Sequence, residues 1–295
     1  MAANFSRRTH LPEGQTPFKA VSQSLIIAID VGNTSVKVMP SDKPATVLRT
    51  PIANAGWDEN VIEQLRCLSD GVEDVEVRVA SVHDVASKRL QQTGTRFLGR
   101  HVRWRAISDS EISMPILTAL PQKTGIDRLL SAFAAKAIHG SPMVTIDAGT
   151  TVTVDLVNER GAFCGGAILP GLAMQTRALA AGTNRLPMID WRRNEDDAMG
   201  KTDRAGRDTT TAIRLGVLSS IVGGIERLLV RYQSAGCVVV TGGDGRRIFD
   251  ELEITNKVFE TELVCRALLN LDNLSDRQEC DSVIPNGQSD QRLSS

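Results

Sequence analysis

The chain has 295 residues, of which 41% are apolar and 23% are charged, and its formal net charge is −1. These values are typical of a globular protein long enough for two domains. The near-neutral charge gives no electrostatic reason to expect nucleic acid or an anionic membrane as a partner.

Strand and helix signals alternate along most of the chain. The first half predicts strands at 25–29 and 36–39, a helix at 57–68, a strand at 75–81, a helix at 85–92, a strand at 102–107 and a helix at 128–138. The second half predicts strands at 144–146, 151–157 and 161–169, helices at 172–181 and 210–232, a strand at 237–240 and a helix at 259–269. We therefore expect an α/β protein with a mixed sheet in each half.

The cysteines and the chain ends indicate a cytoplasmic protein. The five cysteines are widely spread without C-x-x-C spacing, which argues against a zinc site or a disulfide framework and favours idle thiols in a reducing cytoplasm. No apolar run reaches membrane-spanning length, and the N-terminus lacks the apolar core of a signal peptide. Residues 1–22 and 275–295 are polar, and we expect both to be disordered.

Two segments repeat one pattern, LIIAIDVGNTSVK at 25–37 and MVTIDAGTTVTVD at 143–155. Each is an apolar run followed by aspartate, a small residue, glycine and a turn that carries hydroxyl groups. Such a turn offers backbone N–H groups to phosphate oxygens and a carboxylate to a cation. Either copy alone is also typical of a plain hairpin turn. The repetition favours a duplicated fold that holds a polyphosphate between its halves.

Other nucleotide-binding motifs are missing, and three further segments are ambiguous. The sequence has no Walker A loop, and no G-x-G-x-x-G follows the first strand. Asp127 stands where a helix begins, so it either caps that helix or accepts a hydroxyl proton, with Arg128 or backbone amides holding an anionic substrate. The glycine-rich stretches 165–171 and 241–245 are strand-to-helix turns, the second of which could face a nucleobase or ribose.

Six motifs occur in one order between residues 25 and 269: D-x-G-N-T-x-x-K, G-x-D-R, D-x-G-T-x-T-x-D, G-G-x-x-x-P-G, D-T-x-x-A-I-x-x-G and T-G-G-D. Together they resemble the type III pantothenate kinases. The resemblance implies a duplicated fold of the actin-like and acetate/sugar kinase ATPases, with domains at 23–112 and 113–274 and ATP in the cleft between them. The implied reaction is phosphorylation of the 4′-hydroxyl of pantothenate by ATP, the first step of coenzyme A biosynthesis.

The resemblance also implies roles for particular residues. Those expected at ATP are Asp30, Val31, Gly32, Asn33, Thr34, Ser35, Val36, Lys37 and Thr150. Those expected at pantothenate are Gly125, Ile126, Asp127, Arg128 and Thr209, with Asp127 as the proton acceptor. Asp147 is expected to bind a monovalent cation, potassium or ammonium, and we expect Mg²⁺ near Asp30. The resemblance further implies a homodimer.

The sequence departs from the family pattern at two points, and two alternative functions stay open. Thr118 stands where the family usually has a tyrosine of the substrate pocket. Thr202 offers an alternative register to Thr209, which we prefer because the residues after Thr209 then keep the family spacing. The rivals are another small-molecule kinase of the same superfamily and a non-catalytic nucleotide-binding regulator. The short G-x-D-R element favours pantothenate over the first, and retention of Asp127 favours catalysis over the second.

Overall fold

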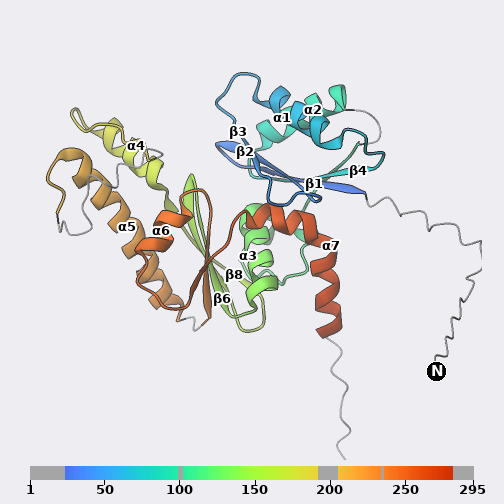
Figure 1. The fold of residues 1–295 in the computed structure, drawn as a ribbon. Coiled ribbons are helices and arrows are strands. Elements are labelled where there is room, and N and C mark those ends of the chain that lie inside the picture. The colour runs from blue at the N-terminus through green and yellow to red at the C-terminus, as the bar shows by residue number, and fades with distance from the viewer. Residues whose placement is uncertain (1–23, 99–101, 192–204, 234–235, 282–295) are drawn as a thin grey trace, which may run out of the picture.

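The computed structural model describes residues 24–98, 102–191, 205–233 and 236–281 (Figure 1). Thr202 lies outside these ranges. The described residues form two five-stranded sheets. The first contains β1 (Leu25–Val31), β2 (Ser35–Pro40), β3 (Leu48–Pro51), β4 (Val75–Ser81) and β5 (Val102–Ala106). The second contains β6 (Met143–Ala148), β7 (Thr151–Val157), β8 (Phe163–Pro170), β9 (Cys237–Thr241) and β10 (Lys257–Phe259).

The two sheets have the same topology. Their orders are β3-β2-β1-β4-β5 and β10-β9-β6-β7-β8, so the second order read backwards matches the first strand by strand. In both, the first three strands pair antiparallel and the last two join in parallel. The prediction of an α/β fold with a mixed sheet in each half is confirmed.

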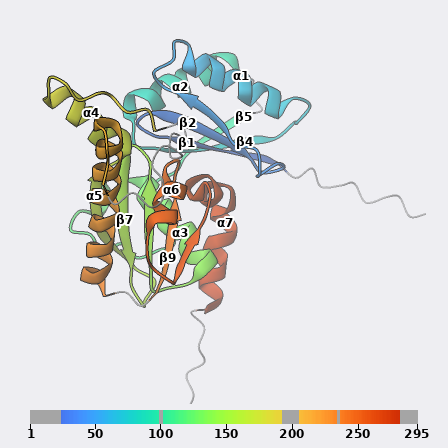
Figure 2. The same cartoon turned by 60° about the vertical axis from the view of Figure 1, so that its left-hand side comes forward.

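The helices divide into three groups around the sheets (Figures 1 and 2). The helices α1 (Trp57–Ser69) and α2 (Asp84–Phe97) cover the outer face of the first sheet. One face of the second sheet carries α4 (Leu172–Gly182), α5 (Thr209–Tyr232) and α6 (Gly245–Glu251). Between the two sheets lie α3 (Ile126–His139) and α7 (Leu263–Asp281). Single 3₁₀ turns occur at Asp109–Glu111 and Pro121–Lys123.

Strand periodicity turns both repeated aspartates toward the middle layer of α3 and α7. In β1, Ala28 packs in the core that contains these helices, whereas Ile27 and Ile29 pack under α1 and α2. Because side chains alternate along a strand, Asp30 shares the face of Ala28. In β6, Met143 packs in the same middle core, so Asp147 also faces α3 and α7. The duplicated strands therefore present equivalent carboxylates to one layer.

Three short elements were missing from the sequence analysis, and one predicted helix was misplaced. The missing elements are β3, α6 and β10. Phe259, predicted as the start of a helix, instead ends β10, which pairs in parallel with β9. The pairing with a neighbouring strand overrides the local helical pattern. The final helix begins at Leu263 and continues to Asp281, past residue 274, where the disordered tail was expected to begin.

The C-terminal helix also crosses the predicted domain boundary at 112/113. Although α7 follows the second sheet in the chain, it packs against β1, β2 and β4 of the first sheet as well as against α3. The division into 23–112 and 113–274 therefore stays a prediction. Within the described ranges, no helix combines the length and apolarity needed to span a membrane.

Candidate active site

A cleft of about 720 Å³ opens between the two sheets. Its walls come from the turn after β1, the turn after β6, the start of α3, the loop after β9 and the segment that follows α4. The first four of these walls contain motifs singled out from the sequence, and Arg49 of β3, Arg177 of α4 and Val264 of α7 also line the cleft.

The two repeated turns meet in this cleft. Gly32 N–H donates to the Ser35 carbonyl at 3.1 Å, and Gly149 N–H donates to the Thr151 carbonyl at 2.9 Å, so the glycine of each turn closes it and the second turn is one residue shorter. Thr34 Oγ1 and Thr150 Oγ1 share a hydrogen bond of 3.0 Å across the cleft. The prediction that the two turns face each other is therefore matched by direct contact.

Asp30, Asp127 and Asp147 are among the aspartates that line the cleft, and repulsion between them disfavours the ionisation of Asp30 and Asp147. Burial raises the pKa of Asp147 to about 6, Lys37 opposes this, and repulsion from Asp30 and Asp127 adds to it. Burial also raises the pKa of Asp30, which Lys37 lowers and Asp127 raises. Ser131 Oγ donates to Asp147 Oδ2 at 3.3 Å, and Lys37 Nζ lies 3.5 Å from Asp30 Oδ2. The cleft thus holds more negative charge than its nearest cation balances.

Asp127 lies in the first turn of α3 but is not its N-cap. The N-cap residue is Gly125, which makes no side-chain capping bond, so the capping interpretation of Asp127 is wrong. The Arg128 backbone N–H donates to Asp127 Oδ1 at 2.8 Å. Burial raises the pKa of Asp127, while that hydrogen bond and the Arg128 charge lower it. The net increase makes this carboxylate a better proton acceptor than one in water.

Arg128 is held in place by Asp155, the last residue of the second repeated motif. Arg128 Nε donates to both carboxylate oxygens of Asp155 at 3.1 Å, and Arg128 Nη2 donates to Asp155 Oδ1. Asp155 is 1% exposed, and the guanidinium also lies over the Phe163 ring, 5.7 Å from its centroid. Arg128 is therefore a fixed cation at the cleft wall rather than a freely moving one.

Three glycines make room for the carboxylates of the second domain. A Cβ atom added at any of them would come within 2.6 Å of a carboxylate oxygen: Gly125 against Asp127 Oδ1, Gly166 against Asp155 Oδ1 and Gly242 against Asp147 Oδ1. A larger residue at any of these points would force the neighbouring carboxylate or backbone to shift. Gly242 additionally has a φ of +98°, which glycine adopts without strain.

Some of the predicted site residues do not reach the cleft with their side chains. Val31 and Val36 are fully buried in the core under α1 and α2, so only their backbone could serve a nucleotide. Thr209 is the exposed first residue of α5 and does not line the cleft. Thr118 Oγ1 shares a hydrogen bond of 2.9 Å with Thr124 Oγ1, where the family's tyrosine would stand.

The sequence analysis missed several residues of the cleft wall. These are Arg49 and Val264, together with Arg177 and the segment from Met188 to Trp191. Arg49 lies on β3, the strand that was not predicted. A further acidic residue, Glu262, touches the cleft cations Lys37 and Arg49. Nothing in its local sequence pattern marks it.

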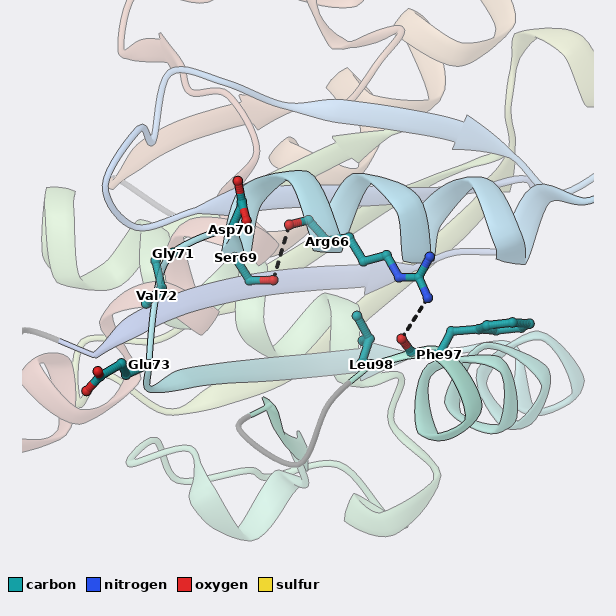
Figure 3. Close-up of a pocket in the computed structure, with 8 residues that line it drawn as sticks. All are labelled: Arg66, Ser69, Asp70, Gly71, Val72, Glu73, Phe97 and Leu98. Carbon is teal, nitrogen blue, oxygen red and sulfur yellow. Dashed lines mark hydrogen bonds between the residues drawn. The ribbon is translucent and has the colours of Figure 1, made fainter.

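A second, smaller hollow lies at the outer edge of the first domain and contains none of the predicted site residues. It is lined by the end of α1, the loop into β4 and the end of α2 (Figure 3). Arg66 Nη2 there donates to the Phe97 carbonyl at 2.9 Å. Because its polar groups serve local structure, the interdomain cleft is the candidate active site.

Comparison with known proteins assigns the chain to a family. Residues 26–231 match the model of the type III pantothenate kinases. The chain belongs to this family. It is 41% identical to a type III pantothenate kinase of Rhodopirellula baltica, over 83% of this chain and 97% of that protein. It is 28% identical to one from Persephonella marina, over 84% and 98%.

Solved structures show weaker likeness. An archaeal actin homologue, Ta0583, is 14% identical with a TM-score of 0.43, over 87% of this chain and 99% of that one. A reductive activator for a corrinoid, iron-sulfur protein is 14% identical with a TM-score of 0.46, over 90% and 62%. The matching topologies of the two sheets and the family membership confirm the predicted duplicated, actin-like kinase fold with an interdomain cleft.

Gly125→Ala tests whether Asp127 must be seated against the backbone of a glycine. The new Cβ would lie 2.6 Å from Asp127 Oδ1, so the carboxylate must move, and we expect kinase turnover to fall roughly 10²-fold. The unfolding temperature should change little, because the φ of −57° at Gly125 suits any residue. Gly182→Ala is the matched control, since a Cβ there meets nothing within 4 Å. Normal turnover in Gly125→Ala would contradict the seating.

Proposed function

We propose that this chain transfers the γ-phosphoryl group of ATP to the 4′-hydroxyl of pantothenate, forming 4′-phosphopantothenate in the first step of coenzyme A biosynthesis. One observation carries the proposal: in a chain that belongs to the type III pantothenate kinases, Asp127 lies in the same cleft as both repeated turns. Because the reaction consumes ATP, the proposal includes a cytoplasmic location.

The residues of the cleft have separate roles in phosphoryl transfer. This reaction depends on positioning and charge neutralisation more than on covalent chemistry. The turn from Asp30 to Lys37 offers backbone N–H groups, hydroxyls and one ammonium to the phosphates. Asp127 accepts the proton of the substrate hydroxyl, a role that its raised pKa favours. Arg128, oriented by Asp155, faces the carboxylate of pantothenate.

The oxygen-rich walls suit hard cations. Within the described ranges, no group of three or more His, Cys, Asp or Glu side chains is arranged to hold a metal, so phosphate oxygens and water would complete any coordination shell. Asp30 would hold Mg²⁺ together with the phosphates, and Asp147 with Ser131 would hold potassium or ammonium. When bound, these cations neutralise phosphate charge. The raised pKa of Asp147 supports this assignment, because a cation would offset the cost of burying its charge.

Asp127→Asn tests the proton acceptor. The amide keeps the shape of the side chain but cannot take the hydroxyl proton, so we expect kcat to fall by roughly 10²–10⁴-fold with the fold intact. Turnover is followed as ADP release, with phosphopantothenate identified by mass spectrometry. Asp42→Asn, at an exposed aspartate outside the cleft, is the control. Near-normal kcat in Asp127→Asn would exclude this role, and wild-type turnover of sugars or acetate without pantothenate would favour the rival kinase.

Potassium dependence tests the cation assigned to Asp147. Activity should be low with sodium as the only alkali cation and should recover with potassium, whereas Asp147→Asn should lose this difference. In the absence of potassium the pKa of Asp147 is about 6, so protons compete with potassium below this pH. The potassium concentration for half-activation should therefore rise about tenfold between pH 8 and pH 5. Equal rates in sodium and potassium would remove the assignment.

The position of Thr209 supports a homodimer with shared sites. Thr209 begins α5, which packs against the face of the second sheet that looks away from α3. Thr209 is not among the residues that line the described cleft of one chain, in which Asp127 lies. We propose that each substrate site receives Thr209 of the partner subunit.

Mixed dimers of Asp127→Asn and Thr209→Arg test this arrangement. Each variant alone should be inactive, and light scattering should show a dimer for both. In a statistical mixture, half of the dimers are hybrids with one intact site, so about one quarter of the wild-type activity should return. If Thr209 served its own subunit, no hybrid would contain an intact site and no activity would return.

A further inference from the structure

Glu262 connects the C-terminal helix to two cations of the first sheet. It directly precedes α7. Lys37 Nζ lies 2.9 Å from Glu262 Oε2, and Arg49 Nη2 donates to Glu262 Oε1 at 3.1 Å. The Glu262 and Lys37 side chains are 18% and 16% exposed, so their ion pair is largely shielded from water, whereas Arg49 is 43% exposed. Shielded pairs with these distances hold their partners more firmly than exposed pairs do.

The backbone of Glu262 is strained. Its φ is +50°, a value that among the described non-glycine residues is shared only with Gln233. Glycine adopts this conformation without strain, whereas a long side chain does not. Residues held in such conformations are kept by their surroundings and often serve a site. At Glu262, the ion pairs with Lys37 and Arg49 are the interactions that hold the side chain in place despite this backbone conformation.

Glu262 lies where the phosphate-binding turn, the C-terminal helix and the loop after β9 come together. Arg49 lines the cleft, and its Nη1 lies 3.2 Å from the point where a Cβ on Gly243 would stand. Val264, two residues after Glu262, also lines the cleft. Through α7, this corner is packed on β1, the strand that ends at the first turn.

Lys37 is balanced between two carboxylates. It lies 2.9 Å from Glu262 and 3.5 Å from Asp30. Burial acts to lower its pKa, but Asp30 and Glu262 outweigh burial and raise it, so the ammonium stays charged. Without Glu262, the ammonium would be drawn toward Asp30 and away from its place opposite the phosphates.

We propose that Glu262 is a positioning residue for phosphoryl transfer, whose carboxylate fixes Lys37 and Arg49 so that both cations face the nucleotide phosphates. The proposal rests on the proposed kinase function. Glu262 itself needs no contact with substrate, because it acts through the two cations.

Glu262→Gly is the decisive variant because it deletes the carboxylate and relieves the backbone strain together. We expect kcat/KM for ATP to fall about 10–100-fold, while the KM for pantothenate and the unfolding temperature stay near their wild-type values. Gln233→Gly is the matched control: it relieves the same backbone conformation at the end of α5, outside the cleft, and should leave kcat/KM unchanged.

A double-mutant cycle separates positioning from general support of the fold. In a Lys37→Met background the loss caused by Glu262→Gly should shrink markedly, because its main partner is already gone. Fully additive losses would overturn the proposal, as would a wild-type kcat/KM for ATP in Glu262→Gly.

Calorimetry of ADP binding keeps this test independent of the acceptor substrate. Glu262→Gly should bind ADP about tenfold more weakly than wild type. Tighter ADP binding would mean that Glu262 competes with the phosphates for the cations, and would overturn the proposal. If wild type fails to phosphorylate pantothenate but Glu262→Gly still weakens ADP binding, the proposed function fails and the role of Glu262 stands.

Discussion

The burial of several carboxylates in one cleft is the constraint on which the structure depends. Removing ionised groups from water costs free energy unless cations or hydrogen-bond donors of the protein take the place of the water. Asp155 is neutralised by Arg128, and Asp30 shares Lys37 with Glu262. Asp147 receives only a hydroxyl donor at hydrogen-bond distance among the contacts described. Because no cationic side chain within the described ranges is bonded to it, burial raises the pKa of Asp147 to about 6.

Duplication is the means by which the fold assembles this charge. Two sheets of equal topology each place an aspartate at the end of the first strand, on the face that strand periodicity turns toward α3 and α7. The copies then differ in their neighbours. The first turn has Lys37 beside its aspartate, whereas the second has Ser131 of α3. This difference agrees with phosphate binding at the first turn and a monovalent cation at the second.

The sequence was sufficient for what local patterns encode and insufficient for what depends on distant partners. Apolar alternation predicted most strands, the repeated pattern predicted the two turns, and Asp127 was singled out by its place before a strongly apolar helix. By contrast, β10 exists only because β9 lies beside it. Glu262 is 213 residues from Arg49, so no window of sequence contains their ion pair. The location of Thr209 likewise depends on which face of the sheet α5 covers.

Close contacts explain why several positions of the motifs are occupied by glycine. A Cβ atom added to Gly125 or Gly166 would clash with a carboxylate oxygen, and one added to Gly171 would clash with the carbonyls of Gly149 and Thr150. The Gly171 N–H also donates a hydrogen bond to the Thr150 carbonyl. A side chain at any of these positions would displace an acidic group or the second turn. Buried carboxylates and backbone carbonyls thus restrict these positions to glycine through packing. A chain that keeps these glycines can therefore keep the acidic groups and the second turn in the arrangement seen in this cleft.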